Sequence, residues 1–299
     1  MRVDKIHMEA YSIQGDILMA RDDLFPSFMG GNKARKMEHI LSDIKEKQCN
    51  AVVSTGGIQS NHCRVVALAC ALQNWPCRLI LHGSREQFFS EQGNALIMRA
   101  AGVLPEFVEA ADIGPAMDEA MEDFKTQGFR PYYLYGGGHN RAGVRAYVQA
   151  VHELKDALPP DHAPDHIFLA SGTGSTQAGL LAGCLEVGWQ HTRVHGISVA
   201  RGKERGREAI AECLDFLDLD TERMSAFIEF YDDFLFGGYG RSTGELQDFI
   251  ARVAEHSGII LDSTYSGKAF FGMVRTIRDQ QLKGKLLFWH TGGIFNLMA

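Results

Sequence analysis

The sequence predicts an α/β protein with open, twisted parallel β-sheets and helices on both faces. Short runs rich in β-branched and aromatic residues alternate with segments of helical periodicity, and this alternation is typical of βαβ units. Glycine-rich clusters at 55–57, 136–138, 171–174 and 292–293 each follow a predicted strand, where such sheets bind ligands. The chain has 299 residues, of which 45% are hydrophobic and 22% charged, so it is long enough for two domains.

The elements of the first half follow from alternating strand-like and helix-like periodicity. The predicted strands are 51–54, 78–81, 103–108 and 132–135. The predicted helices are 61–73, 90–101, 115–126 and 142–154. The strand at 103–108 has the weakest pattern of the four.

The second half continues the alternation after a polar segment. That segment carries Pro159, Pro160 and Pro164 among charged residues, a composition typical of a linker. The predicted strands that follow are 166–170, 194–199, 227–231, 259–261 and 286–289. A helix is predicted at 175–185, and each later strand lies near a helical pattern.

Charge, cysteine usage and hydropathy argue against several classes of function. The net charge of −7 disfavours non-specific binding to nucleic acid or to anionic membranes, which needs a basic field. The six cysteines include no Cys-x-x-Cys pair and none at zinc-ligand spacing from histidine, so we expect no metal site and a reduced, cytoplasmic protein. No run approaches the ~18 apolar residues of a membrane span, and residues 1–20 lack the apolar core of a signal peptide.

Lys33 follows two glycines and an asparagine, just ahead of an apolar-periodic stretch. A lysine beside glycines is most often an ordinary loop residue. Lys36 weakens that interpretation, because it shares a face with Lys33 if a helix begins here. One amine can then form a Schiff base while the other meets a phosphate. Two ammonium groups this close would lower each other's pKa and favour a neutral nucleophile, and Asn32 can orient the lysine or a cofactor.

A glycine-rich turn later in the chain offers an anion site. It consists of Ser171, Gly172, Thr173, Gly174, Ser175 and Thr176. Its amides and hydroxyls lie beside the positive end of a predicted helix, which favours a phosphate. The dinucleotide pattern fails because Gln177 stands where the third glycine belongs, and no Gly-Lys-Ser/Thr follows as in ATP-binding loops. A plain strand-to-helix turn is the alternative.

Polar side chains gather at a second junction between a predicted strand and helix. They are Thr55, Gln59, Ser60, Asn61 and His62. A capping serine or asparagine is the simplest interpretation. So many donors exceed the needs of a cap, however, and suit a carboxylate or a cofactor oxygen.

Three single residues complete the set. Tyr239 lies in a glycine loop, Tyr265 follows the predicted strand 259–261, and Thr291 follows the strand 286–289. Neither tyrosine indicates a site by itself, whereas Thr291 can hydrogen-bond to a ring nitrogen. A reactive lysine with a separate phosphate cradle is the combination that a pyridoxal phosphate enzyme needs.

Together these motifs resemble the 1-aminocyclopropane-1-carboxylate (ACC) deaminase and D-cysteine desulfhydrase family. That family belongs to the tryptophan-synthase-β-like, fold type II group of pyridoxal phosphate enzymes. The matching segments are 21–24, 31–33, 59–62, 171–176, 239, 265–268 and 290–293, and they come in the family's order. The resemblance implies pyridoxal 5'-phosphate as cofactor, a small amino acid as substrate and a homodimer. We expect a larger cofactor-binding domain of 1–47 plus 141–299, a smaller α/β domain of 48–140, and the cofactor in the cleft between them.

The resemblance also implies a role for each motif. Lys33 would bind the cofactor covalently, and Lys36 would bind its phosphate. The residues expected at the cofactor are Lys33, Lys36, Asn61, Gly172, Thr173, Gly174, Ser175, Thr176, Ser266 and Thr291. The residues expected at the substrate are Ser60, Asn61, His62, Tyr239 and Tyr265. Ser60, Tyr239 and Tyr265 would join Lys33 as catalytic residues.

Ser266 and Thr291 separate the two branches of the family. The deaminase branch has glutamate and leucine there, whereas this chain is similar to the desulfhydrase branch. A neutral hydroxyl leaves a weaker electron sink than a carboxylate, adequate for expelling a good leaving group such as sulfide. We therefore expect α,β-elimination from D-cysteine or a related β-substituted amino acid, giving pyruvate, ammonia and sulfide. The alternatives are an ACC deaminase giving 2-oxobutyrate and ammonia, a non-catalytic pyridoxal phosphate binder, and a plain nucleotide-binding domain.

Overall fold

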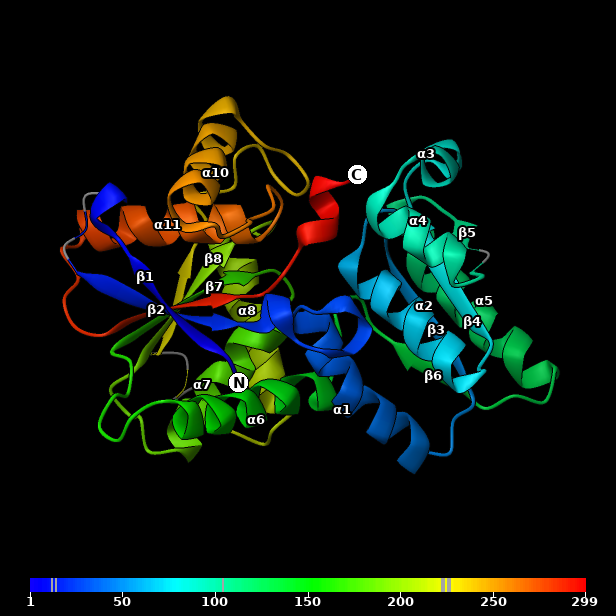
Figure 1. Cartoon of the computed structure of the whole chain (residues 1–299). Coiled ribbons are helices and arrows are strands. Elements are labelled where there is room, and N and C mark those ends of the chain that lie inside the picture. Colours follow the sequence, from blue (N-terminus) through cyan, green and yellow to red (C-terminus); the bar gives the residue numbers. More distant parts are fainter. Residues whose placement is uncertain (12, 14, 104, 222–223, 225–226) are drawn as a thin grey trace.

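The fold is built around two β-sheets (Figure 1). The computed structural model describes residues 1–11, 13, 15–103, 105–221, 224 and 227–299. The larger sheet has the strand order β1 (Val3–His7), β2 (Asp16–Arg21), β10 (Leu286–His290), β7 (His166–Ser171), β8 (Arg193–Ser198) and β9 (Ile228–Tyr231). The smaller sheet has the order β5 (Glu106–Phe107), β4 (Cys77–His82), β3 (Ala51–Gly57) and β6 (Pro131–Leu134).

Helices cover both faces of each sheet. They are α1 (Asn32–Glu46), α2 (Asn61–Gln73), α3 (Arg85–Ser90), α4 (Gly93–Ala100), α5 (Ile113–Thr126), α6 (Arg141–Ala157), α7 (Ser175–Glu186), α8 (Lys203–Asp215), α10 (Gly244–Ser257) and α11 (Ser266–Asp279). Single 3-10 turns lie at Glu9–Tyr11, Asp22–Leu24, Ser27–Met29, Ala110–Asp112 and Ile294–Leu297. In Figure 1, α10 and α11 lie on one side of the larger sheet, and α6 and α7 lie on the other.

The central strands are buried on both faces, and alternate side chains enter different cores. In β10, Leu287 and Trp289 pack in one core with residues of α6, α7 and α8. Leu286 and Phe288 point the other way and pack with residues of α10 and α11. This two-residue alternation explains why the strand is apolar at every position, as expected for a parallel sheet covered on both sides.

The α/β fold with parallel sheets and helices on both faces is confirmed, with one exception at an edge. All described pairings are parallel except that of β1 with β2, which is antiparallel. Sequence patterns missed both of these strands. Their burial is uneven, and β1 has one buried residue, Ile6, so neither shows a long apolar run.

Two predicted strands differ from the structure. The segment 259–261 forms no strand. Ile259 and Leu261 are buried in the core beside α11, so their apolar character reflects packing of a connecting segment. The strand predicted at 103–108 shortens to Glu106–Phe107, and Leu104 lies outside the described residues.

Two further predictions need correction. The helix predicted at 90–101 shortens to α4, Gly93–Ala100, because Glu91 and Gln92 are extended and separate it from Ser90, the last residue of α3. The segment with Pro159, Pro160 and Pro164 joins α6 to β7. Both of these elements contribute to the same hydrophobic core, so this segment connects neighbours within one unit. Among the described residues, no helix has the length and apolarity needed to cross a membrane.

Candidate active site

A cavity of about 260 Å³ lies where the two sheets face each other. Its walls come from the carboxyl ends of β3, β6, β7, β8 and β10 and from the first turns of α1 and α2. This is the edge at which parallel sheets bind ligands. The sequence-predicted residues that line it are Lys33, Ser60, Asn61, His62, Gly172, Thr173, Gly174, Thr176, Tyr239, Tyr265 and Thr291. Lys36, Ser175 and Ser266 lie outside this lining.

The start of α1 is held in place by the segment that follows β10. The Asn32 amide donates to the Thr291 carbonyl at 3.0 Å. Gly31 has a φ of 88°, and a Cβ built on Gly292 would lie 2.8 Å from the Gly31 Cα. Glycine is therefore needed at both positions, because the two backbones approach too closely for a side chain. Lys33, one residue into the helix, is aimed into the cavity as a result.

Lys33 carries an amine suited to nucleophilic attack. Among the described residues it has no hydrogen-bond or ion-pair partner. Burial lowers its pKa to about 8, which increases the fraction of neutral amine near physiological pH. The sequence argument had attributed this shift to the neighbouring ammonium of Lys36, whereas burial is its cause for Lys33.

Lys36 contacts the glycine-rich turn from outside the cavity lining. Its Nζ donates to Ser175 Oγ at 2.8 Å and lies 3.4 Å from the Gly137 carbonyl oxygen. Burial and, secondarily, the charge of Lys33 hold the pKa of Lys36 well below its usual range. The predicted pairing of one lysine at the cavity with a second at the turn is therefore present, with Ser175 as the link.

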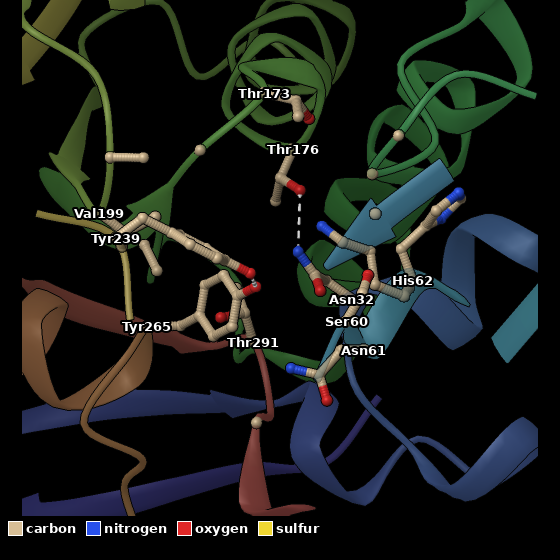
Figure 2. Close-up of a pocket in the computed structure, with 18 of the residues that line it drawn as sticks. Asn32, Ser60, Asn61, His62, Thr173, Thr176, Val199, Tyr239, Tyr265 and Thr291 are labelled. Atoms are coloured by element: carbon tan, nitrogen blue, oxygen red, sulfur yellow. Dashed lines mark hydrogen bonds between the residues drawn. The ribbon is translucent and has the colours of Figure 1, made fainter. Parts of the chain in front are cut away.

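The turn before α7 is shaped as an anion cradle. Gly174 has a φ of 86°, and a Cβ there would lie 2.8 Å from the Ala209 carbonyl oxygen. No described side chain caps α7, so its first amides remain available to an anion. Asn32 Nδ2 donates to Thr176 Oγ1 at 3.2 Å and ties the cradle to the start of α1 (Figure 2).

Two orphaned hydroxyls indicate that the cavity is built for a polar ligand. Ser171 Oγ and Thr55 Oγ1 are buried and have no hydrogen-bond partner among the described residues. Both residues line the cavity, from β7 and β3 respectively. Buried hydroxyls normally have partners, and a bound ligand would supply them. A free amine, an anion cradle and unpaired hydroxyls fit pyridoxal phosphate. No cluster of candidate metal ligands occurs among the described residues.

The first residues of α2 have structural partners as well as cavity positions. Ser60 Oγ accepts from the Cys63 amide at 3.2 Å, so Ser60 is the helix cap that the simpler interpretation proposed. Asn61 Oδ1 accepts from Asn94 Nδ2 at 3.0 Å. Figure 2 shows Ser60 and Asn61 on the same side of the cavity as Asn32.

His62 is a neutral imidazole. Burial and the nearby charges of Lys33 and Lys36 lower its pKa to about 3. Its Nε2 lies 2.9 Å from Ser54 Oγ, and that hydroxyl donates its own proton to the Leu134 carbonyl. Nε2 must therefore carry the proton and donate to Ser54, which leaves Nδ1 as an acceptor.

Tyr239 and Tyr265 lie side by side in one wall of the cavity. Their hydroxyls are hydrogen-bonded, and their ring centroids lie 5.8 Å apart at 74°. Figure 2 shows both phenol tips turned toward Asn32 and Ser60. Burial raises the pKa of Tyr265 well above its usual value, so Tyr265 stays protonated and able to donate at neutral pH.

Ser266 and Thr291, which were predicted together, lie in different surroundings. Thr291 lines the cavity. Ser266 is the first residue of α11 and is fully buried, and its hydroxyl donates to Asp262 Oδ1 at 2.7 Å. The carboxylate of Asp262 thus engages the serine that we expected at the cofactor. No aspartate or glutamate occurs among the described residues that line the cavity.

Sequence reasoning missed two polar residues of the wall. His82 is the last residue of β4, and Arg201 lies three residues after the end of β8. The Arg201 guanidinium has no ion-pair partner within the described part of the chain. Both residues lie within two residues of the end of a predicted strand, so the rule that ligands bind at strand ends was the signal that could have found them.

Comparison with known proteins identifies the family. The sequence model of the family described as "Pyridoxal-phosphate dependent enzyme" matches residues 6–292. The chain belongs to this family. Pyridoxal phosphate is therefore its cofactor, and the chain is an enzyme of the lyase and deaminase type. The plain nucleotide-binding domain weighed above is thereby set aside.

Individual relatives of this pyridoxal phosphate enzyme confirm the narrower resemblance. A protein of Pyrococcus horikoshii provisionally named 1-aminocyclopropane-1-carboxylate deaminase is 36% identical over 289 residues, which cover 94% of this chain and 86% of the relative. The D-cysteine desulfhydrase of Klebsiella pneumoniae is 31% identical over 297 residues, covering 95% and 88%. A crystal structure described as an ACC deaminase homologue superposes with a TM-score of 0.88 at 33% identity, covering 99% of this chain and 90% of the other. The fold type II assignment is confirmed with them.

Proposed function

We propose that this enzyme catalyses α,β-elimination of D-cysteine or a related β-substituted amino acid, giving pyruvate, ammonia and sulfide. The observation that carries the proposal is the lack of a carboxylate among the described residues of the cavity wall. Thr291 offers a hydroxyl, and none of the described lining residues is a carboxylate. The similarity to a D-cysteine desulfhydrase supports the same choice.

When bound, pyridoxal phosphate would supply an acceptor for the electron pair left at the substrate Cα. A carboxylate beside the ring nitrogen would keep that nitrogen protonated and strengthen this electron acceptance. Opening a cyclopropane ring needs the stronger acceptor, whereas expelling a thiolate from Cβ does not. A wall with hydroxyls and no carboxylate therefore favours β-elimination.

The residues of the cavity can supply the remaining steps. The Lys33 amine, which has no partner among the described residues, would bind the cofactor and would take the proton from Cα. Ser60 and the Asn61 side chain lie opposite the tyrosines, where they can hold the substrate carboxylate. The protonated Tyr239 and Tyr265 pair can donate a hydrogen bond to the departing sulfur.

ACC deaminase is the second candidate, because the Pyrococcus horikoshii relative and the superposed structure carry that description. The two reactions leave different products. Elimination from D-cysteine consumes one water and releases pyruvate, ammonia and sulfide. Deamination of ACC consumes one water and releases 2-oxobutyrate and ammonia. A third possibility is a cofactor binder without turnover.

The test is a product assay on the purified enzyme with bound cofactor. D-cysteine, L-cysteine and ACC are supplied separately, and sulfide and 2-oxo acids are measured. Lys33→Ala serves as the inactive control. Lys155→Ala is the matched control, since Lys155 donates to the Val187 carbonyl at 3.0 Å on another part of the molecule. Formation of 2-oxobutyrate from ACC without sulfide from either cysteine would overturn the proposal, and inertness towards all three would favour the binder.

A further inference from the structure

Lys268 is a buried cation that the proposed reaction does not use. It is the third residue of α11 and is fully buried. It lies outside the cavity lining. A positive charge in the first turn of a helix is unfavourable because it meets the positive end of the helix dipole. Burial adds to that cost and lowers the pKa of Lys268 to about 8.

Two backbone carbonyls compensate for this placement. Lys268 Nζ donates to the Leu235 and Gly238 carbonyl oxygens, each at 2.7 Å. The same two carbonyls close consecutive turns, because they accept from the amides of Gly238 at 3.0 Å and Arg241 at 3.2 Å. Lys268 therefore binds two consecutive turns, 235–238 and 238–241, which share Gly238.

The segment that Lys268 holds has an unusual backbone. Phe236, Gly237, Gly238 and Gly240 all have positive φ, at 50°, 90°, 114° and 69°. Glycines are conformationally free in solution, and a non-glycine residue at positive φ is held there by its surroundings. A segment of this kind needs an external anchor to keep one conformation.

Tyr239 lies inside this segment, and its hydrogen-bond partner lies at the start of the same helix. Tyr265 directly precedes α11, and Asp262 Oδ2 accepts from the Tyr265 amide at 2.9 Å. One tyrosine is thus fixed by Asp262, whereas the other depends on the turns held by Lys268. The two hydroxyls meet in the cavity wall (Figure 2).

We infer that Lys268 is a positioning residue that holds the Leu235–Arg241 turns against α11 and so sets the Tyr239 hydroxyl opposite Tyr265. Its side chain is not part of the cavity lining. Its effect on turnover rests on the proposed function, whereas its effect on the segment does not.

The first test follows the segment itself. Hydrogen exchange is measured on the cofactor-loaded enzyme and on Lys268→Met, which removes the donors and keeps the length of the side chain. Lys155→Met is the matched control, because that lysine also donates to a backbone carbonyl. We expect exchange across 235–241 to accelerate about tenfold or more in Lys268→Met alone, with the sheets unchanged.

The outcomes of this test are decisive in both directions. Unchanged protection across 235–241 would contradict the inference, and so would an equal loss of protection throughout the molecule. If Lys268→Met does not fold, Lys268→Gln repeats the measurement. Failure of both variants, with Lys155→Met folded, would show that Lys268 supports the whole fold and would overturn the positioning role.

The second test asks whether Lys268 acts through Tyr239. Lys268→Met should lower kcat about tenfold or more, with a smaller change in KM. In a Tyr239→Phe background, Lys268→Met should lower kcat by less than about a further twofold. Lys268→Arg, which keeps a charged donor, should recover part of the loss. Losses that multiply in the double variant would refute the coupling. Failure of the proposed function would appear separately, as absence of turnover in the unmodified enzyme, and would leave the exchange result intact.

Discussion

Replacing Gly174 by alanine tests the phosphate cradle at its tightest point. The residue has a φ of 86°, and a Cβ would lie 2.8 Å from the Ala209 carbonyl oxygen and 2.9 Å from the Ile210 nitrogen. The left-handed backbone costs about 1–2 kcal/mol for alanine. The overlap involves the backbone of α8, which has no flexible side chain to move, and adds about 1–3 kcal/mol. We expect a loss of about 2–5 kcal/mol in the free energy of unfolding.

Gly188 provides a control at the other end of the same helix. It has a φ of 83°, and a Cβ there would meet nothing within 4 Å. Gly188→Ala should therefore lose about 1–2 kcal/mol from backbone strain alone. The assay is urea unfolding of both variants without cofactor, followed by titration with pyridoxal phosphate.

The two variants should differ in cofactor binding as well as stability. Gly174→Ala must shift the turn or α8, and we expect its affinity for pyridoxal phosphate to fall about tenfold or more. Gly188→Ala should bind as the unmodified protein does. Equal stability of the two variants, together with unchanged cofactor affinity in Gly174→Ala, would refute the reasoning.

Three further predictions concern the charged groups. Lys33→Ala should lose the visible absorbance of the lysine-bound cofactor, and Lys155→Ala should retain it; visible absorbance that persists without Lys33 would rule out its covalent role. Burial lowers the pKa of Lys33 to about 8. The rate at which cofactor attaches to the apoenzyme should therefore rise about tenfold for each unit of increasing pH up to pH 8, and level off above it. A stopped-flow pH profile that is flat from pH 6 to about 8 would contradict this deprotonation. Arg201→Gln should weaken cofactor binding about tenfold by titration, because Arg201 lines the same cavity as Thr173 and Gly174 of the cradle; unchanged affinity would place Arg201 outside the phosphate site.

Much of the fold was readable from the sequence, because buried strands and amphipathic helices carry their periodicity locally. The predicted helix 61–73 coincides with α2, and the strand 166–170 differs from β7 by one residue. The segment 259–261 was misread because its apolar residues are buried in the absence of a sheet ladder. The sequence pattern reports burial, and burial does not require a neighbouring strand.

Residues of the site could be predicted where they follow the end of a strand. Contacts between segments far apart in the sequence could not be predicted in this way. Lys33 and Thr291 were recognised from their own motifs, and the structure brings them to one cavity. Ser266 donates its hydroxyl to Asp262, four residues before it, and its place at the cofactor stays a prediction. The link from Lys268 to the Gly238 carbonyl joins residues 30 positions apart, and no local pattern marks it.

β-Elimination from D-cysteine and deamination of ACC are told apart by their products. Purified enzyme is incubated with D-cysteine or with ACC, and sulfide, pyruvate and 2-oxobutyrate are quantified in each reaction. We expect sulfide and pyruvate in equal amounts from D-cysteine, and loss of both in Lys33→Ala. Release of 2-oxobutyrate from ACC with no sulfide from D-cysteine would contradict it.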